Sequence, residues 1–164
     1  MNRYLLDANI FIYAHRKYYA FDIVPSFWSE LKRCAEAGHI ISLDRIKREI
    51  DDYPETDALK KWANREFSSY FVSTDNKEVI SAYQEIINWA VAQPQFTAAA
   101  KDQFARVADS WLIAAAKAFD CILVTHELFD ENVRRKIPIP NVCRHFGIPY
   151  IDTFDMLRGL KIQL

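Results

Sequence analysis

The sequence predicts a three-layer α/β/α sandwich with a central, mostly parallel sheet, and three observations lead to this class. Short, continuously apolar runs alternate with longer segments of helical periodicity. Strands that are separated by helices pair in parallel and are covered on both faces, which explains why the runs are apolar throughout. A length of 164 residues is that of one domain with its own core, so residues 1–164 are expected to form a single unit.

Five strands are expected, and each is a short apolar run. Their ranges are 4–6, 40–41, 70–72, 121–125 and 149–151. The run from Cys121 to Thr125 is the clearest strand, because it contains three branched aliphatic residues in succession and follows a long apolar helix.

Helices are expected between the strands, where apolar residues recur at spacings of three and four. Their ranges are 9–16, 25–38, 43–51, 57–67, 76–92, 98–104, 108–119, 141–146 and a last helix after 152. Pro25 suits a first helical turn and Gly38 a helix end, while Ser42 is expected to cap the helix 43–51. Asp152 or Thr153 is expected to cap the last helix.

Composition excludes several classes of protein. Apolar residues make up 51% of the chain and glycine occurs three times, as in compact, helix-rich domains, and a net charge of -1 gives no overall basic field. The three cysteines lie in apolar stretches, so we expect reduced thiols in a cytoplasmic protein. Asp7 and Asn9 interrupt the first apolar run, so we expect no signal peptide, and no run approaches the roughly 18 apolar residues of a membrane span.

Two acidic residues follow predicted strands. Asp7 comes directly after the strand 4–6, with apolar residues on both sides, and Glu127 follows the strand 121–125. In open parallel sheets, ligands bind outside the carboxyl ends of the strands. An ionised Asp in apolar surroundings is unfavourable unless a positive partner meets it, so Asp7 indicates a functional site.

Two further acids lie on helices that begin near the same sheet edge. Glu49 comes three residues after Ile46 and therefore borders the buried face of its helix. Asp109 lies in the first turn of the helix 108–119, where a negative charge suits the helix dipole. Taken singly, Glu49, Asp109 and Glu127 are typical of solvated or helix-start acids, so the functional interpretation depends on their convergence with Asp7.

Four converging carboxylates would repel one another and raise each other's pKa, and bound divalent cations remove this conflict. Oxygen ligands without cysteine or paired histidine favour Mg²⁺ or Mn²⁺ over Zn²⁺. Such a site can activate water and neutralise the charge on a phosphoryl group in its transition state.

Four sequence blocks resemble the PIN domain in their order and spacing, over nearly the whole chain. They are 6–12 with Asp7 and Asn9, Ile46-x-x-Glu49, 108–116 with Asp109, and 122–127 with Thr125 and Glu127. PIN domains are metal-dependent ribonucleases, and many small ones are VapC-type toxins of bacterial toxin–antitoxin pairs. The block 137–143 is more similar to an uncharacterised PIN-like subfamily than to the typical toxins.

The resemblance implies roles for specific residues. Asp7, Glu49, Asp109 and Glu127 would bind the metal, and Asn9 and Thr125 would be polar helpers in RNA hydrolysis by a metal-activated water. The family more often has Asp at the fourth position, and Asp130 is the alternative to Glu127 here. A protein antitoxin is the partner that the resemblance implies.

Basic residues cluster near the proposed acids, and a basic rim would let an RNA backbone approach an acidic floor. The candidates for RNA binding are Arg16, Lys17, Arg45, Arg48, Arg134 and Arg135. Ordinary solvated surface is an equally good interpretation of each cluster. Aromatic residues crowd the segment 18–28, where a partner groove or homodimer face is an alternative to core packing.

Other functions remain as alternatives. A haloacid-dehalogenase-type phosphohydrolase also begins with an Asp after its first strand, but it normally needs a second Asp where this chain has Asn9. A non-catalytic PIN-like module that binds RNA or protein is the alternative from a different class. A zinc site is disfavoured because Cys143 and His145 are two residues apart on a predicted helix and point to different sides.

Overall fold

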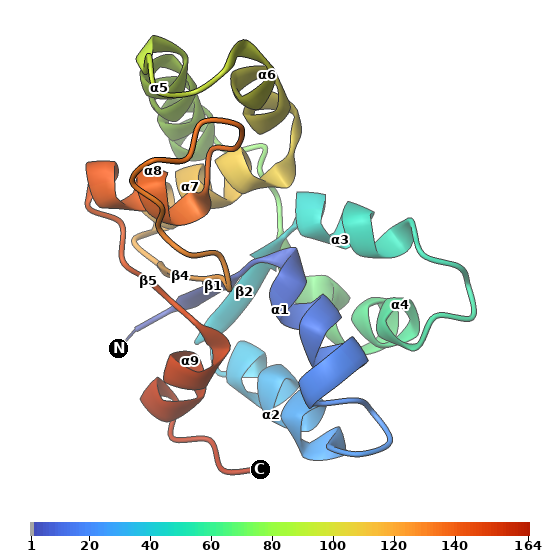
Figure 1. The fold of residues 1–164 in the computed structure, drawn as a ribbon. Coiled ribbons are helices and arrows are strands. Elements are labelled where there is room, and N and C mark those ends of the chain that lie inside the picture. The colour runs from blue at the N-terminus through green and yellow to red at the C-terminus, as the bar shows by residue number, and fades with distance from the viewer. Residues whose placement is uncertain (1) are drawn as a thin grey trace.

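The computed structural model describes residues 2–164 and has a five-stranded parallel sheet between layers of helices (Figure 1). The strands are β1 (Tyr4–Leu6), β2 (Ile40–Leu43), β3 (Phe71–Val72), β4 (Ile122–Val124) and β5 (Tyr150–Ile151). Their order in the sheet is β3-β2-β1-β4-β5, and every neighbouring pair is parallel. The predicted fold class is therefore confirmed.

Helices form the connections between the strands. They are α1 (Ala8–Tyr13), α2 (Pro25–Glu36), α3 (Asp44–Asp51), α4 (Ala58–Trp62), α5 (Lys77–Ala92), α6 (Ala98–Arg106), α7 (Ala108–Phe119), α8 (Ile139–Phe146) and α9 (Thr153–Gly159). Two π-helical turns, η1 (Ala14–Tyr18) and η2 (Ala63–Phe67), extend α1 and α4, and a 3-10 turn, η3 (Ser68–Tyr70), leads into β3. Within residues 2–164, no helix combines the length and apolar character needed to cross a membrane.

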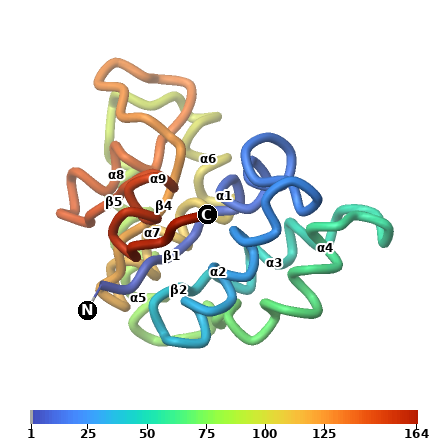
Figure 2. Tube along the Cα trace, turned by 90° about the horizontal axis from the view of Figure 1, so that it is seen from below, coloured from blue at the N-terminus to red at the C-terminus, as the bar shows by residue number. Residues whose placement is uncertain are grey.

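The helices cover the sheet on both sides. Helices α5, α7 and α8 lie above it in Figure 1, and α2 and α9 lie below it. Helix α2 packs against β2, and in the view from below α2 and α9 lie in front of the sheet (Figure 2). Gly159 of α9 packs directly against the Tyr4 hydroxyl, which occupies the space that a Cβ at this position would need. This close approach fixes the last helix on the amino end of the central strand.

An aromatic cluster anchors the helix that follows β1. The ring of Phe11 is fully buried and lies with its centroid 5.5 Å from that of Phe67, 6.0 Å from Phe71 and 6.2 Å from Trp62. These rings belong to α4, η2 and β3, so they lock α1 against the second half of the sheet. Because α1 begins one residue after Asp7, this packing also fixes the backbone at the end of β1.

The structure corrects some of the expected helix ends. Ser42 does not cap α3, because its buried hydroxyl donates to the Leu6 carbonyl oxygen at 2.7 Å and so joins β2 to β1; the cap residue is Leu43. The expected helix 57–67 is divided into α4 and η2, and α8 begins at Ile139 instead of residue 141. Asp152 is the cap of α9 and accepts from the Asp155 N–H at 2.9 Å.

Candidate active site

Asp7 lies buried at the carboxyl end of the central strand, with a side chain only 4% exposed. Its N–H donates to the Val124 carbonyl oxygen at 3.1 Å, which extends the pairing of β1 with β4 to the residue that carries the acid. Its Oδ1 caps α1 by accepting from the Ala8 N–H at 2.7 Å. The strand and the helix together therefore fix the Asp7 carboxyl group at the sheet edge.

Thr125 connects two of the predicted site residues. Its buried hydroxyl donates to Asp7 Oδ2 at 3.2 Å and accepts from the Glu127 N–H at 3.1 Å. Because Thr125 immediately follows β4, one hydroxyl group joins the ends of two neighbouring strands. The structure thus places Thr125 beside Asp7, where the sequence motif located it.

The Asp7 carboxyl group is energetically unusual. Burial raises its pKa from 3.8 to about 8, and the negative charges of Asp109 and Glu127 act in the same direction. The hydrogen bonds from Ala8 and Thr125 oppose the rise without cancelling it. Without a compensating cation, this group is protonated at neutral pH.

Asp109 is the second acid whose protonation is strongly perturbed. It lies half-buried in the first turn of α7, and burial raises its pKa to about 7, with further contributions from Glu127 and Glu49. The nearby ammonium of Lys136 lowers it. The charge of Glu127 acts on both Asp7 and Asp109, and the charge of Asp109 acts on Asp7, so these three predicted site residues lie within electrostatic reach of one another.

Glu49 lies at the edge of this cluster. Its side chain is exposed, but it lines a hollow of about 180 Å³ together with Asp109 and Lys136. Partial dehydration in this hollow and the charge of Asp52 raise the Glu49 pKa. The remaining walls come from α6, its connection to α7, and the residue after Lys136: Ala100, Gln103, Phe104, Val107 and Ile137.

Glu127 is held by a backbone donor and by a basic side chain. Its Oε2 accepts from the Ile139 N–H at 3.3 Å, at the beginning of α8, where the helix dipole favours a negative charge. Its Oε1 forms an ion pair with Lys136 Nζ, and the carboxylate side chain is 14% exposed. Lys136 directly follows the candidate RNA-binding residues Arg134 and Arg135 in the sequence, and the structure brings it among the acids.

The other two candidates for the acid site, Asn9 and Asp130, are both exposed. Asn9 is exposed in the first turn of α1, two residues beyond Asp7. Asp130 is exposed and organises its own loop: its Oδ1 accepts from the Asn132 N–H at 3.0 Å, and its backbone pairs with the Asn141 side chain. Glu127, and not Asp130, is thus the acid whose charge reaches Asp7 and Asp109.

The candidate RNA-binding residues differ in how far they pack on the protein. Arg45 is half-buried, stacks 4.1 Å from the Trp111 ring and bonds Thr74 at 3.2 Å. Five candidates are exposed and so accessible to a nucleic acid: Arg16, Lys17, Arg48, Arg134 and Arg135. Of these, Arg16 lies 5.2 Å from the Tyr53 ring and Lys17 lies 5.3 Å from the Tyr13 ring.

The four carboxylates form a donor set that fits a hard divalent cation, because they provide oxygen ligands without sulfur or nitrogen. Glu127 Oε1 is buried and accepts no hydrogen bond within residues 2–164, so the ion pair with Lys136 is its compensation. In this part of the chain, no three acidic, histidine or cysteine side chains are gathered closely enough to hold a metal ion as they stand. The donor chemistry therefore fits, and a lysine lies among the donors.

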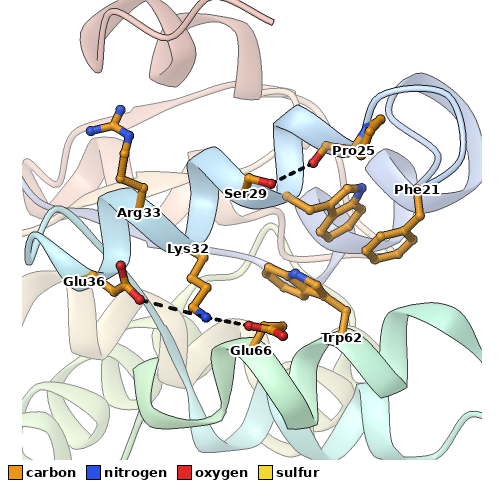
Figure 3. A pocket seen from close by; sticks show the side chains of 9 residues that line it. Phe21, Pro25, Ser29, Lys32, Arg33, Glu36, Trp62 and Glu66 are labelled. Atoms are coloured by element: carbon orange, nitrogen blue, oxygen red, sulfur yellow. Dashed lines mark hydrogen bonds and ion pairs between the residues drawn. The ribbon is translucent and has the colours of Figure 1, made fainter.

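A second hollow, of about 530 Å³, lies between α2 and the segment 58–67 (Figure 3). Phe21 and Trp62 form its aromatic wall, and the Lys32–Glu66 ion pair crosses it at 2.5 Å. None of the four acids lines it. The aromatic residues that crowd the early part of the sequence are thus mostly packed together, with one partly open face.

Comparison with known proteins identifies the family and confirms the fold. A family model described as "Domain of unknown function (DUF4411)" matches residues 4–164. The chain belongs to this family. The DUF4411 chain is similar to a chain in the crystal structure of VapBC2 from Rickettsia felis bound to a DNA fragment from their promoter, with a TM-score of 0.54 and 15% sequence identity. The likeness covers 91% of this chain and 97% of that one and shows a PIN-like, VapC-type fold. No curated protein matches the sequence.

Proposed function

We propose that this protein is a Mg²⁺- or Mn²⁺-dependent endoribonuclease with Asp7, Glu49, Asp109 and Glu127 as metal-binding acids. The observation that carries the proposal is the buried position of Asp7 at the carboxyl edge of the sheet, where the charges of Asp109 and Glu127 add to the effect of burial and raise its pKa. A group of buried acids that is this unfavourable without a cation is typical of functional sites. The PIN-like fold supports the same interpretation.

The residues of the site have distinct tasks in this proposal. A divalent cation held by these acids would supply positive charge at the phosphodiester and would promote ionisation of the attacking water. Asp7 and Asp109 would have to lose their protons to act as ligands, so metal affinity is expected to rise with pH up to their raised pKa values. Thr125 holds the Asp7 carboxylate in its rotamer, and the first turn of α8 orients Glu127.

The direct test is cleavage of a labelled RNA by purified protein with Mn²⁺, by the same protein in EDTA, and by the Asp7→Asn variant. Wild type with Mn²⁺ is expected to hydrolyse the RNA, and the other two reactions are expected to be inactive. Asp22→Asn, which replaces an exposed loop acid, is the matched control and should retain activity. Full cleavage by Asp7→Asn, or in EDTA, would refute the assignment.

We further propose that the protein acts as the toxin of a toxin–antitoxin pair in the cytoplasm, with a protein antitoxin as partner. The support is the likeness to a chain of the VapBC2 structure. Expression of the wild type is then expected to arrest growth, whereas expression of Asp7→Asn is not. Growth arrest by both proteins would separate toxicity from the acid cluster.

A second candidate is a non-catalytic PIN-like module that binds RNA or protein. The observation in its favour is the ion pair of Glu127 with Lys136, which already neutralises one of the acids. Calorimetry with Mn²⁺ distinguishes the two candidates, because a non-catalytic module is expected to show no binding at the acid cluster.

A further inference from the structure

Lys136 brings a positive charge into the acid cluster. Its Nζ pairs with Glu127, and the charges of Asp109 and Asp7 also act on it and raise its pKa against the effect of burial. The same side chain lines the hollow that contains Glu49 and Asp109. The Lys136 ammonium group therefore occupies the same region among the acids as a divalent cation that they would bind.

The backbone that carries Lys136 is fixed on its carboxyl side. Ile137 is 2% exposed, Ile139 is fully buried, and the Ile139 N–H holds the other oxygen of Glu127. The lysine side chain itself is 58% exposed, although its partner carboxylate is 14% exposed. Lys136 can therefore turn from Glu127 into solvent by a change of rotamer, without displacement of the buried backbone.

We infer that Lys136 Nζ serves as the counter-ion of the acid cluster in the metal-free protein and has to leave Glu127 when a divalent cation binds. This inference rests on the proposed function. Its basis is that Glu127 Oε1 is buried, accepts no hydrogen bond within residues 2–164 and has this one ion pair. A carboxylate oxygen in contact with an ammonium group cannot also be a close ligand of a cation without strong repulsion between the two positive charges.

The departure of Lys136 is coupled to arrival of the cation. Release of Lys136 alone is unfavourable, because it would leave the largely buried Glu127 carboxylate without a compensating charge. A divalent cation would compensate the charge of Glu127 and also the carboxylates of Asp7 and Asp109. Replacement of the Lys136 ammonium by this cation is therefore favourable, whereas release of Lys136 into solvent without a replacement is not. Metal affinity is thereby reduced by the free energy of the Lys136–Glu127 pair.

The test is titration calorimetry of Mn²⁺ into the metal-free protein at one fixed pH. Lys136→Met keeps the length of the side chain and removes its charge, so it is expected to bind Mn²⁺ about tenfold or more tightly than wild type. Lys136→Arg retains the positive charge and is expected to bind within about threefold of wild type. Lys117→Met is the matched control, since Lys117 pairs with Glu85 at 3.3 Å and does not line the hollow.

Unfolding in EDTA provides a second measurement that is independent of metal affinity. Lys136→Met is expected to be less stable than wild type without metal and to regain that stability in Mn²⁺, because only the cation then compensates Glu127. Equal or weaker Mn²⁺ affinity of Lys136→Met would overturn the inference and leave the proposed function in place. Failure of all four proteins to bind Mn²⁺ would refute the metal site itself and the inference with it.

Discussion

Replacing Asp7 by Asn removes a buried ionisable group and is expected to stabilise the metal-free protein at neutral and alkaline pH. The folded-state pKa of Asp7 is about 8, compared with the ordinary value of 3.8. Between these values the unfolded chain carries an ionised Asp7 and the folded chain a protonated one, so folding takes up a proton. The stability of wild type is therefore greatest below pH 4 with respect to this group and is lost as the pH rises to about 8.

The size of the effect follows from the same two pKa values. At pH 7, about 3 pH units above the ordinary pKa, the raised pKa of Asp7 lowers the free energy of unfolding by about 4 kcal/mol. Local relaxation reduces this, so we expect Asp7→Asn to gain about 2 kcal/mol, or about 4–8 °C in Tm for a chain of this size. The amide can retain both contacts, because its oxygen accepts from the Ala8 N–H and its NH₂ group can donate to the Thr125 hydroxyl.

The assay is urea unfolding of wild type, Asp7→Asn and Asp22→Asn in EDTA at pH 5, 7 and 8.5. The gain of Asp7→Asn over wild type should be small at pH 5, grow to pH 8 and then remain constant, and Asp22→Asn should follow wild type. Asp109, with a pKa of about 7, adds its own pH dependence to the free energy of unfolding of all three proteins. The difference in this free energy between Asp7→Asn and wild type therefore reports on Asp7. Parallel pH profiles for Asp7→Asn and wild type would refute the argument from burial.

Three further predictions concern the support of the site and its access. Thr125→Val removes the donor to Asp7 and the acceptor for the Glu127 N–H, and should lower the free energy of unfolding by about 1–2 kcal/mol in urea titrations. Phe11→Ala leaves a cavity in the aromatic cluster below α1 and should cost about 3–5 kcal/mol in the same assay. Arg134→Gln and Arg135→Gln, made in the inactive Asp7→Asn protein, should each weaken RNA binding and reduce the slope of log K against log salt by about 0.7 in fluorescence anisotropy; an unchanged slope would remove these residues from the RNA path.

The strand positions could be predicted because the strands are short apolar runs, and β1 and β2 are buried along their whole length. The run Tyr4–Leu6 is apolar throughout for this reason, and its place in the middle of the sheet follows from the same burial. Asp7 could be recognised as a site residue because the apolar residues around it leave its carboxylate poorly solvated, which is unfavourable without a functional partner. Thr125 and Glu127 followed from their position after β4, the neighbouring strand.

The sequence could not reveal interactions between distant side chains and backbone atoms. Serine is a common helix-cap residue, but the Ser42 hydroxyl donates to the Leu6 carbonyl oxygen of the neighbouring strand instead of capping α3. Lys136 belongs to an exposed run of three basic residues in the sequence, and only the fixed backbone of the following buried residues directs it to Glu127. The π-helical turns η1 and η2 likewise could not be told from α-helix by the spacing of apolar residues in the sequence.

The central position of β1 has a consequence for the order in which the molecule can be built. Its partners are β2, which begins at Ile40, and β4, which begins at Ile122, and the hydrogen bond between Asp7 and Thr125 spans 118 residues of chain. Pairings of such long range form slowly, because the intervening chain loses its freedom first. During synthesis, a ribosome-bound chain that has released Asp7 and Glu49 still lacks the strand that brings Glu127 to them. The acid cluster therefore comes into being only when most of the polypeptide has been made, and no shorter nascent fragment contains it.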